Sequence, residues 1–186
     1  MTTQTKQFAS QYERDENNWI LFPRDVTYRR SMFPQEVFTH PAKANIYLIE
    51  ELWRYLTDPE QSIIDPFGGT GTLLLAAREG RKVVLIDVEQ PFVEMQKNTI
   101  QAWKDQGVDL ADVYLHQGDN RQELNKIQFL CDASIFSPPY ASGLLGGYRD
   151  DDYKGGEKTS VLDAYGGATA SALNMGRLNP FHFGYA

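Results

Sequence analysis

The sequence lacks three features whose absence narrows the class of protein. It has one cysteine, Cys131, in 186 residues, so neither an internal disulfide nor a cysteine-based zinc site can form. No stretch approaches the roughly 18 apolar residues that cross a bilayer. Residues 1–30 also lack the apolar stretch of a signal peptide. We therefore expect a cytoplasmic protein with no membrane partner and no metal site.

Positive charge is also in short supply. Eighteen Lys and Arg side chains face 25 Asp and Glu side chains, which gives a net charge of -7. A protein whose main affinity comes from neutralising phosphates carries the opposite sign, so a stand-alone nucleic-acid binder is disfavoured. An enzyme can still meet nucleic acid through a local basic patch. The candidate patch consists of Arg24, Arg29 and Arg30, with Lys43 nearby.

What is present is typical of an ordinary folded domain. Apolar residues make up 41% of the chain and charged residues 23%. The chain divides into an N-terminal arm, a core and a glycine-rich loop region: residues 1–38, 39–140 and 141–186. Residues 1–16 are polar and without periodicity, which predicts a frayed or loosely docked arm. Prolines punctuate residues 19–41, so an irregular segment over the core is expected there.

Strand and helix signals alternate along the core region. Apolar residues at three- and four-residue spacing predict a helix over residues 44–57, whose opposite face carries Glu50, Glu51 and Arg54. Strands are then predicted at residues 62–65, 82–87, 113–115 and 129–136, and helices at residues 72–79, 91–106 and 121–126. This alternation implies βαβ units and therefore an α/β fold with a parallel sheet, covered on both faces. Ligands bind such sheets beyond the carboxyl ends of the strands.

The first predicted strand leads into a glycine-rich loop, Asp65-Pro66-Phe67-Gly68-Gly69-Thr70-Gly71-Thr72. Glycine permits positive φ and close backbone approach, and the next helix points its N-terminus at the same place. We interpret the loop as a site for a nucleotide-like ligand; a tight turn without a ligand is the alternative. No lysine follows the glycines, and Leu74 stands where the dinucleotide fingerprint has its third glycine, so phosphate cradling is disfavoured.

Polar or rigid residues follow the other predicted strands. Asp87 ends the second strand, where an acid can accept both hydroxyls of a ribose. Asp119 follows the third, where a carboxylate can accept from an adenine amino group, although Gly-Asp-Asn is equally ordinary turn chemistry. The fourth runs into Ser137-Pro138-Pro139-Tyr140, whose prolines stop the strand and hold the neighbouring carbonyls rigidly.

These residues together resemble the S-adenosylmethionine-dependent DNA methyltransferases that act on amino groups, the N4-cytosine and N6-adenine class. The glycine loop is similar to the family's cofactor loop, and residues 39–43 to a segment that touches the methionine end of the cofactor. The resemblance covers residues 40–140 and implies a Rossmann-like methyltransferase fold. The cofactor-binding residues that it implies are His40, Lys43, Asp65, Pro66, Phe67, Gly68, Gly69, Thr70, Gly71, Thr72, Asp87 and Asp119. The catalytic residues that it implies are Ser137, Pro138, Pro139 and Tyr140.

The resemblance also implies a mechanism on double-stranded DNA. Ser137 and the Pro138 carbonyl accept hydrogen bonds from the target amine, while Tyr140 stacks on a base flipped out of the duplex. Serine at this position, where relatives acting on adenine more often carry Asp or Asn, favours cytosine N4 as the acceptor. Adenine N6 is the alternative. RNA guanine methylation ranks lower, because only about forty residues precede the first predicted core helix, too few for an RNA-binding domain.

The sequence departs from the family after Tyr140, where glycines become frequent. The resemblance calls for further strands and a DNA-recognition region, which the sequence does not contain, so we expect a fold incomplete at its C-terminal end. A fragment, a split enzyme or a short form would each explain this. A cofactor-binding module without turnover, completed by a second polypeptide, is therefore the second functional hypothesis. Residues 141–186 are either a substrate-facing segment or a surface excursion.

Overall fold

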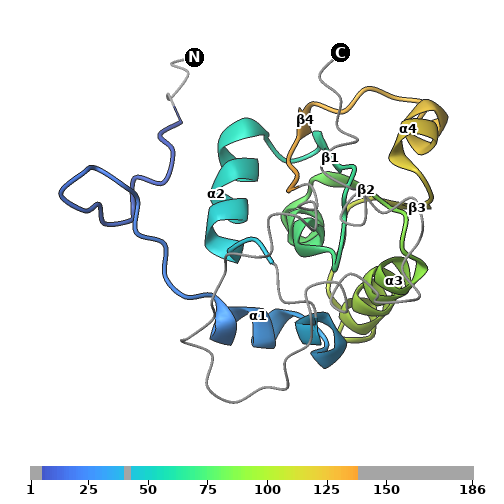
Figure 1. Ribbon diagram of the computed structural model, residues 1–186, viewed down its shortest axis with the longest axis horizontal. Helices are drawn as coiled ribbons and strands as arrows, with labels where there is room; N and C mark the ends of the chain where they lie inside the picture. The colour runs from blue at the N-terminus through green and yellow to red at the C-terminus, as the bar shows by residue number, and fades with distance from the viewer. Residues whose placement is uncertain (1–5, 40–42, 138–186) are drawn as a thin grey trace, which may run out of the picture.

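A four-stranded parallel sheet organises the protein (Figure 1). The computed structural model describes residues 6–39 and 43–137. The strands are β1 (Ser62–Asp65), β2 (Lys82–Asp87), β3 (Val113–Gln117) and β4 (Ala133–Ser134). They lie in the order β3-β2-β1-β4, and every neighbouring pair is parallel. The prediction of an α/β fold with four parallel strands is confirmed.

Helices precede the first strand and fill the connections between the strands. They are α1 (Val26–Met32), η1 (Gln35–Thr39), α2 (Ile46–Leu56), η2 (Thr72–Glu79), α3 (Gln90–Asp105), α4 (Asn120–Glu123) and η3 (Leu124–Lys126), where η denotes a 3-10 helix. The helix after the glycine loop has its predicted bounds but is wound as a 3-10 helix. None of the helices in the described parts of the chain has the length and apolarity to cross a membrane.

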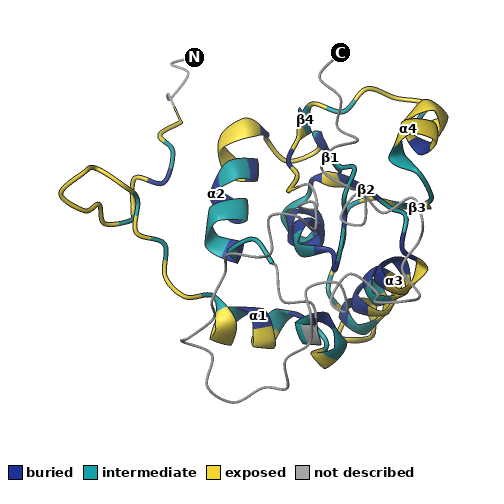
Figure 2. Cartoon of the chain, viewed as in Figure 1, coloured by how far each residue is buried: buried dark blue, intermediate teal, exposed yellow. Residues whose placement is uncertain are grey.

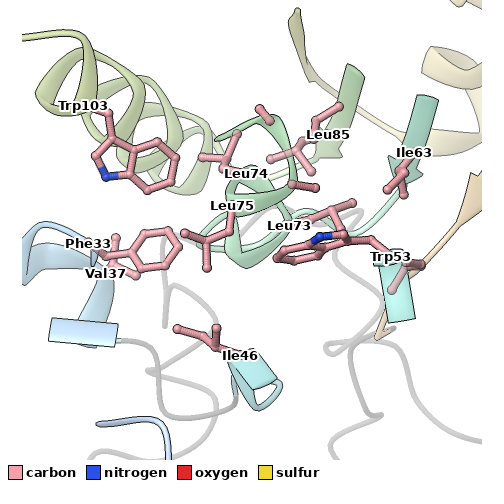
Figure 3. Close-up of a cluster of buried hydrophobic side chains, with 14 residues drawn as sticks. Phe33, Val37, Ile46, Trp53, Ile63, Leu73, Leu74, Leu75, Leu85 and Trp103 are labelled. Atoms are coloured by element: carbon pink, nitrogen blue, oxygen red, sulfur yellow. The ribbon is translucent and has the colours of Figure 1, made fainter. Parts of the chain in front are cut away.

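The main core lies between one face of the sheet and three helices. Ile63 of β1 and Leu85 of β2 point into it, as Figure 3 shows. Trp53 of α2, Leu74 of η2 and Trp103 of α3 pack against them. Each of these side chains is almost fully buried, and burial of a large apolar side chain stabilises a fold by about 1.5–3 kcal/mol.

The opposite face of the sheet carries the alternate residues of the same strands. Ile64, Val84 and Ile86 form a second buried cluster, against which Ile127 and Cys131 pack. This alternation is the two-residue period of a strand with both faces covered. The chain between β3 and β4 therefore crosses the face that α2, η2 and α3 leave open.

This crossing explains why the fourth strand is shorter than predicted. The prediction of a strand over residues 129–136 is wrong at its start, because only Ala133 and Ser134 pair with β1. Phe129 instead lies against Tyr114 of β3, with ring centroids 5.3 Å apart, and Leu130 is exposed. The chain has to pass from β3 across the sheet to β1, so these apolar residues belong to the connection.

The segment before α2 is more regular than its prolines suggested. Residues 19–39 contain α1 and η1, where an irregular segment was expected. The Asp25 carboxylate accepts a hydrogen bond from the guanidinium of Arg29 at 2.7 Å and one from the N–H of Ile46 at 2.9 Å. Contacts with the start of α2 therefore stabilise a seven-residue helix that is too short to be stable alone.

The sequence left a frayed and a loosely docked N-terminal arm open, and the described residues 6–16 are docked. Ala9 is fully buried, and its N–H donates to the Glu51 carboxylate at 3.2 Å. Gln11 donates to the same carboxylate. Glu51 is consequently buried. Glu50 is also buried and accepts a hydrogen bond from the hydroxyl of Tyr28 in α1, although the periodicity of α2 places both carboxylates opposite its apolar stripe. The exposed residues of the arm gather in the loop that leads to Trp19 (Figure 2).

Candidate cofactor site and catalytic edge

The glycine loop at the end of β1 has a conformation that only glycine adopts easily. Gly69 and Gly71 have φ values of +49° and +84°. A Cβ atom on Gly71 would lie 2.8 Å from Cδ1 of Leu74 and 3.0 Å from Cγ of Gln96. Gly68 is anchored by its N–H, which donates to the carbonyl oxygen of Ile86 in β2 at 2.8 Å. The loop is thus packed tightly against both the helix that follows it and α3.

Two side chains hold the backbone of Gly69 from opposite sides. The Asp87 carboxylate accepts from the N–H of Gly69 at 2.7 Å and from the N–H of Glu89 at 2.9 Å. Nε2 of Gln96 donates to the carbonyl oxygen of Gly69 at 2.7 Å, and Gln96 is fully buried. Gln96 was not among the residues predicted from the sequence; the one signal for it is an amide side chain on the buried, mostly apolar face of α3.

The fourth strand brings the serine of the tetrapeptide to this same edge. The N–H of Ile135 donates to the carbonyl oxygen of Ile64 at 3.0 Å, which continues the pairing of β4 with β1. Phe136 then packs on Phe67 of the glycine loop, with ring centroids 5.7 Å apart. Ser137 follows and is exposed. Pro138, Pro139 and Tyr140 lie outside the described residues, and so does His40.

A comparison with known protein families identifies the chain. A family model described as DNA methylase matches residues 2–98, which is more than half of the sequence. The chain belongs to the DNA methylase family. This family comprises methyltransferases of cytosine N4 and adenine N6 in DNA. None of the curated proteins compared with the chain matches it.

The matched region contains the glycine loop and Asp87 of this DNA methylase but not Asp119 or Ser137. Asp119 caps α4, where its carboxylate accepts from the N–H of Arg121 at 3.0 Å and from Nε of Arg121 at 2.9 Å. Its pKa is lowered, chiefly by the hydrogen bond from Arg121. Asn120 donates to the carbonyl oxygen of Pro66 at 3.1 Å and so connects α4 to the glycine loop. The turn interpretation of Asp119 is thus realised, and its contact with adenine stays a prediction.

The basic patch expected to meet DNA is smaller in the methylase than the sequence suggested. Arg29 is only 2% exposed and bonded within the protein, so it cannot reach a phosphate. Arg24 and Arg30 remain exposed. The prediction of a patch of three arginines is therefore wrong for Arg29, because α1 turns this side chain towards the core.

The carboxylates at the ends of β1 and β2 fit a cofactor that brings hydroxyl donors and positive charge. Burial raises the pKa of Asp65 to about 7, despite a hydrogen bond from the N–H of Phe67, and the charge of Asp87 adds to the effect. Burial likewise raises the pKa of Asp87 to about 6. Neither carboxylate takes part in an ion pair among the described residues. Ribose hydroxyls and a cationic group would stabilise their ionised forms.

We expect binding of S-adenosylhomocysteine, the product of S-adenosylmethionine, to strengthen as the pH rises from 5 to 8. Protonated Asp87 cannot accept both ribose hydroxyls, so affinity should fall about tenfold for each pH unit below its pKa of about 6. Isothermal titration calorimetry at several pH values measures this. Asp87→Asn should bind weakly with a flatter pH profile. An Asp87→Asn profile as steep as the wild type would contradict the assignment.

The raised pKa values of Asp65 and Asp87 should affect the stability of the fold in the opposite direction to ligand binding. A carboxyl group whose pKa is higher in the folded state holds more protons there than in the unfolded state. The free energy of unfolding of the ligand-free protein should therefore decrease as the pH rises from about 4 to 7. Urea denaturation at matched ionic strength measures this decrease and separates it from the effect on binding.

Proposed function

We propose that this DNA methylase transfers the methyl group of S-adenosylmethionine to N4 of cytosine in double-stranded DNA. The observation that supports the proposal is the packing of Phe136, the residue before Ser137, on Phe67 of the glycine loop. Serine in the first position of the tetrapeptide supports cytosine over adenine as the target. The family assignment supports DNA as the substrate.

In this proposal the glycine loop and the two buried carboxylates bind the cofactor. Asp87 accepts hydrogen bonds from its ribose hydroxyls, and Asp65 faces its positive charge. When bound, S-adenosylmethionine supplies a methyl group activated by a sulfonium centre. Gln96 and Asp87 keep the backbone of Gly69 fixed, so the loop is already ordered before the ligand arrives.

Ser137 acts on the target base. The exocyclic amine of cytosine is a poor nucleophile, because its lone pair is delocalised into the ring. The Ser137 hydroxyl and the Pro138 carbonyl accept hydrogen bonds from this amine and localise its lone pair on nitrogen. Tyr140 stacks on the flipped base and offsets part of the stacking lost from the duplex. Much of the remaining rate increase comes from holding amine and methyl group in line.

The product of the reaction decides between the functional hypotheses. We expect N4-methylcytosine when the full chain is incubated with S-adenosylmethionine and unmethylated DNA, and the DNA is digested to nucleosides for mass spectrometry. Detection of N6-methyladenine alone would support methyl transfer to an amino group of DNA and contradict cytosine as the target base. If the chain binds S-adenosylhomocysteine but forms no methylated nucleoside, the result would favour a cofactor-binding module without turnover. Adding a second polypeptide would then test whether activity appears.

A further inference from the structure

The buried guanidinium of Arg29 joins parts of the chain that surround the proposed cofactor site. Arg29 is 2% exposed, whereas Arg24 and Arg30 are exposed. Burial of a charged group is costly unless its donors find acceptors. The acceptors of Arg29 therefore show what this side chain holds in place.

Three acceptors from three segments surround the guanidinium. Nη1 donates to Oγ1 of Thr72, the first residue after Gly71, at 2.9 Å. Nη2 donates to the Asp25 carboxylate at 2.7 Å and to the carbonyl oxygen of Ala44 at 2.6 Å. Arg29 thus connects α1, the chain that leads into α2, and the end of the glycine loop.

Lys43 precedes this anchored stretch and shares its electrostatic surroundings. Burial, as the largest cause, and the positive charge of Arg29 lower the pKa of Lys43 to about 8, while the charge of Asp25 opposes both effects. Two partly or fully buried cations disfavour one another, and a ligand carboxylate beside Lys43 would relieve this repulsion. The methionine end of S-adenosylmethionine carries such a carboxylate.

We infer that Arg29 is a positioning residue that holds Ala44 against Thr72 and thereby places Lys43 to bind the amino-acid end of the cofactor. The inference rests on the proposed function, because it takes the glycine loop as the site of S-adenosylmethionine. It assigns Arg29 no contact with the ligand. Arg29 should therefore govern affinity for the amino-acid end of the ligand and leave affinity for the nucleoside part nearly unchanged.

Two ligands and one matched pair of variants test this inference. 5′-Methylthioadenosine keeps the nucleoside and sulfur of S-adenosylhomocysteine but lacks its amino and carboxyl groups. Arg29→Gln should misplace Lys43 and so weaken its contact with the ligand carboxylate. The Kd of S-adenosylhomocysteine should then rise at least about tenfold, the usual effect of losing a charged contact. The Kd of 5′-methylthioadenosine should change less than about twofold. The exposed neighbour provides the control, since Arg30→Gln should leave both constants unchanged.

A second variant keeps the test decisive if Arg29→Gln does not fold. Thr72→Val removes only the hydroxyl that Arg29 bonds and leaves the contacts with Asp25 and Ala44 in place. It should produce the same selective loss of S-adenosylhomocysteine affinity, smaller in size. Calorimetry on the full chain measures both ligands.

The outcomes separate this inference from the proposal on which it rests. Equal losses of affinity for both ligands would overturn the inference and mean that Arg29 only supports the fold. Unchanged affinities in both variants would overturn it as well. A wild-type chain that binds neither ligand would contradict the proposed function itself.

Discussion

Replacing Ser137 by alanine should lower kcat at least about 100-fold, comparable to the loss of one hydrogen bond that acts in a transition state. The Ser137 hydroxyl is proposed to contact the target amine, so removing it should act on transfer and not on the cofactor. The Kd of S-adenosylhomocysteine should therefore stay within about twofold of wild type. Single-turnover methylation of DNA and calorimetry measure the two quantities separately.

Ser134→Ala is the matched control for this prediction. Ser134 lies three residues earlier on β4, is exposed, and donates its hydroxyl to the carbonyl oxygen of Ile64 at 3.3 Å. Its loss should leave kcat within about twofold, since a neutral hydrogen bond at the surface contributes about 1 kcal/mol to folding at most. A Ser137→Ala protein that turns over normally but fails to bind cofactor would refute the assignment.

Replacing Gly71 by alanine should lower the free energy of unfolding by about 2–5 kcal/mol, from left-handed backbone strain together with overpacking. The φ of +84° is strained for alanine. The new Cβ would lie 2.8 Å from Cδ1 of Leu74, which is fully buried, and 3.0 Å from Cγ of Gln96. Urea denaturation measures the loss. The distorted loop should also weaken S-adenosylhomocysteine binding at least about tenfold.

Gly107→Ala separates the two causes. Gly107 ends α3 with a similar φ of +75°, but a Cβ atom there meets nothing within 4 Å. This variant should lose only the strain contribution of about 1–2 kcal/mol and keep its cofactor affinity. Equal destabilisation by the two variants would mean that the cofactor loop relaxes freely and is not packed as described.

Strand and helix positions in the core were predictable because their signals are local. β1 and β2 have the predicted bounds, and α3 differs from its prediction by one residue at each end. Buried strands are short apolar runs, and the glycines and prolines that punctuate them act on their own backbone. The glycine loop and Asp87 could be found for the same reason, since the loop leads out of β1 and Asp87 is the last residue of β2.

Errors arose where a residue's environment is made by distant parts of the chain. Glu50 and Glu51 have the spacing of a solvated face, but Tyr28 of α1 donates to Glu50 and the N-terminal arm covers Glu51. Phe129 and Leu130 are apolar, as expected for a strand, but they lie in the connection from β3 to β4. α1 carries no strong local helix signal and depends on the bonds that Asp25 makes to Arg29 and Ile46.

The α/β class, the glycine loop and the order of polar residues along the strand ends are encoded locally, because strand period, glycine and proline act on the backbone geometry of their own segment. Which of those residues lie together depends on how distant segments pack. The parallel pairing of β4 with β1 brings Phe136 against Phe67, and the fold of α1 onto α2 withdraws Arg29 from the DNA-facing patch. Such contacts depend on burial and on bonds between segments 15 to 70 residues apart, which no local pattern encodes.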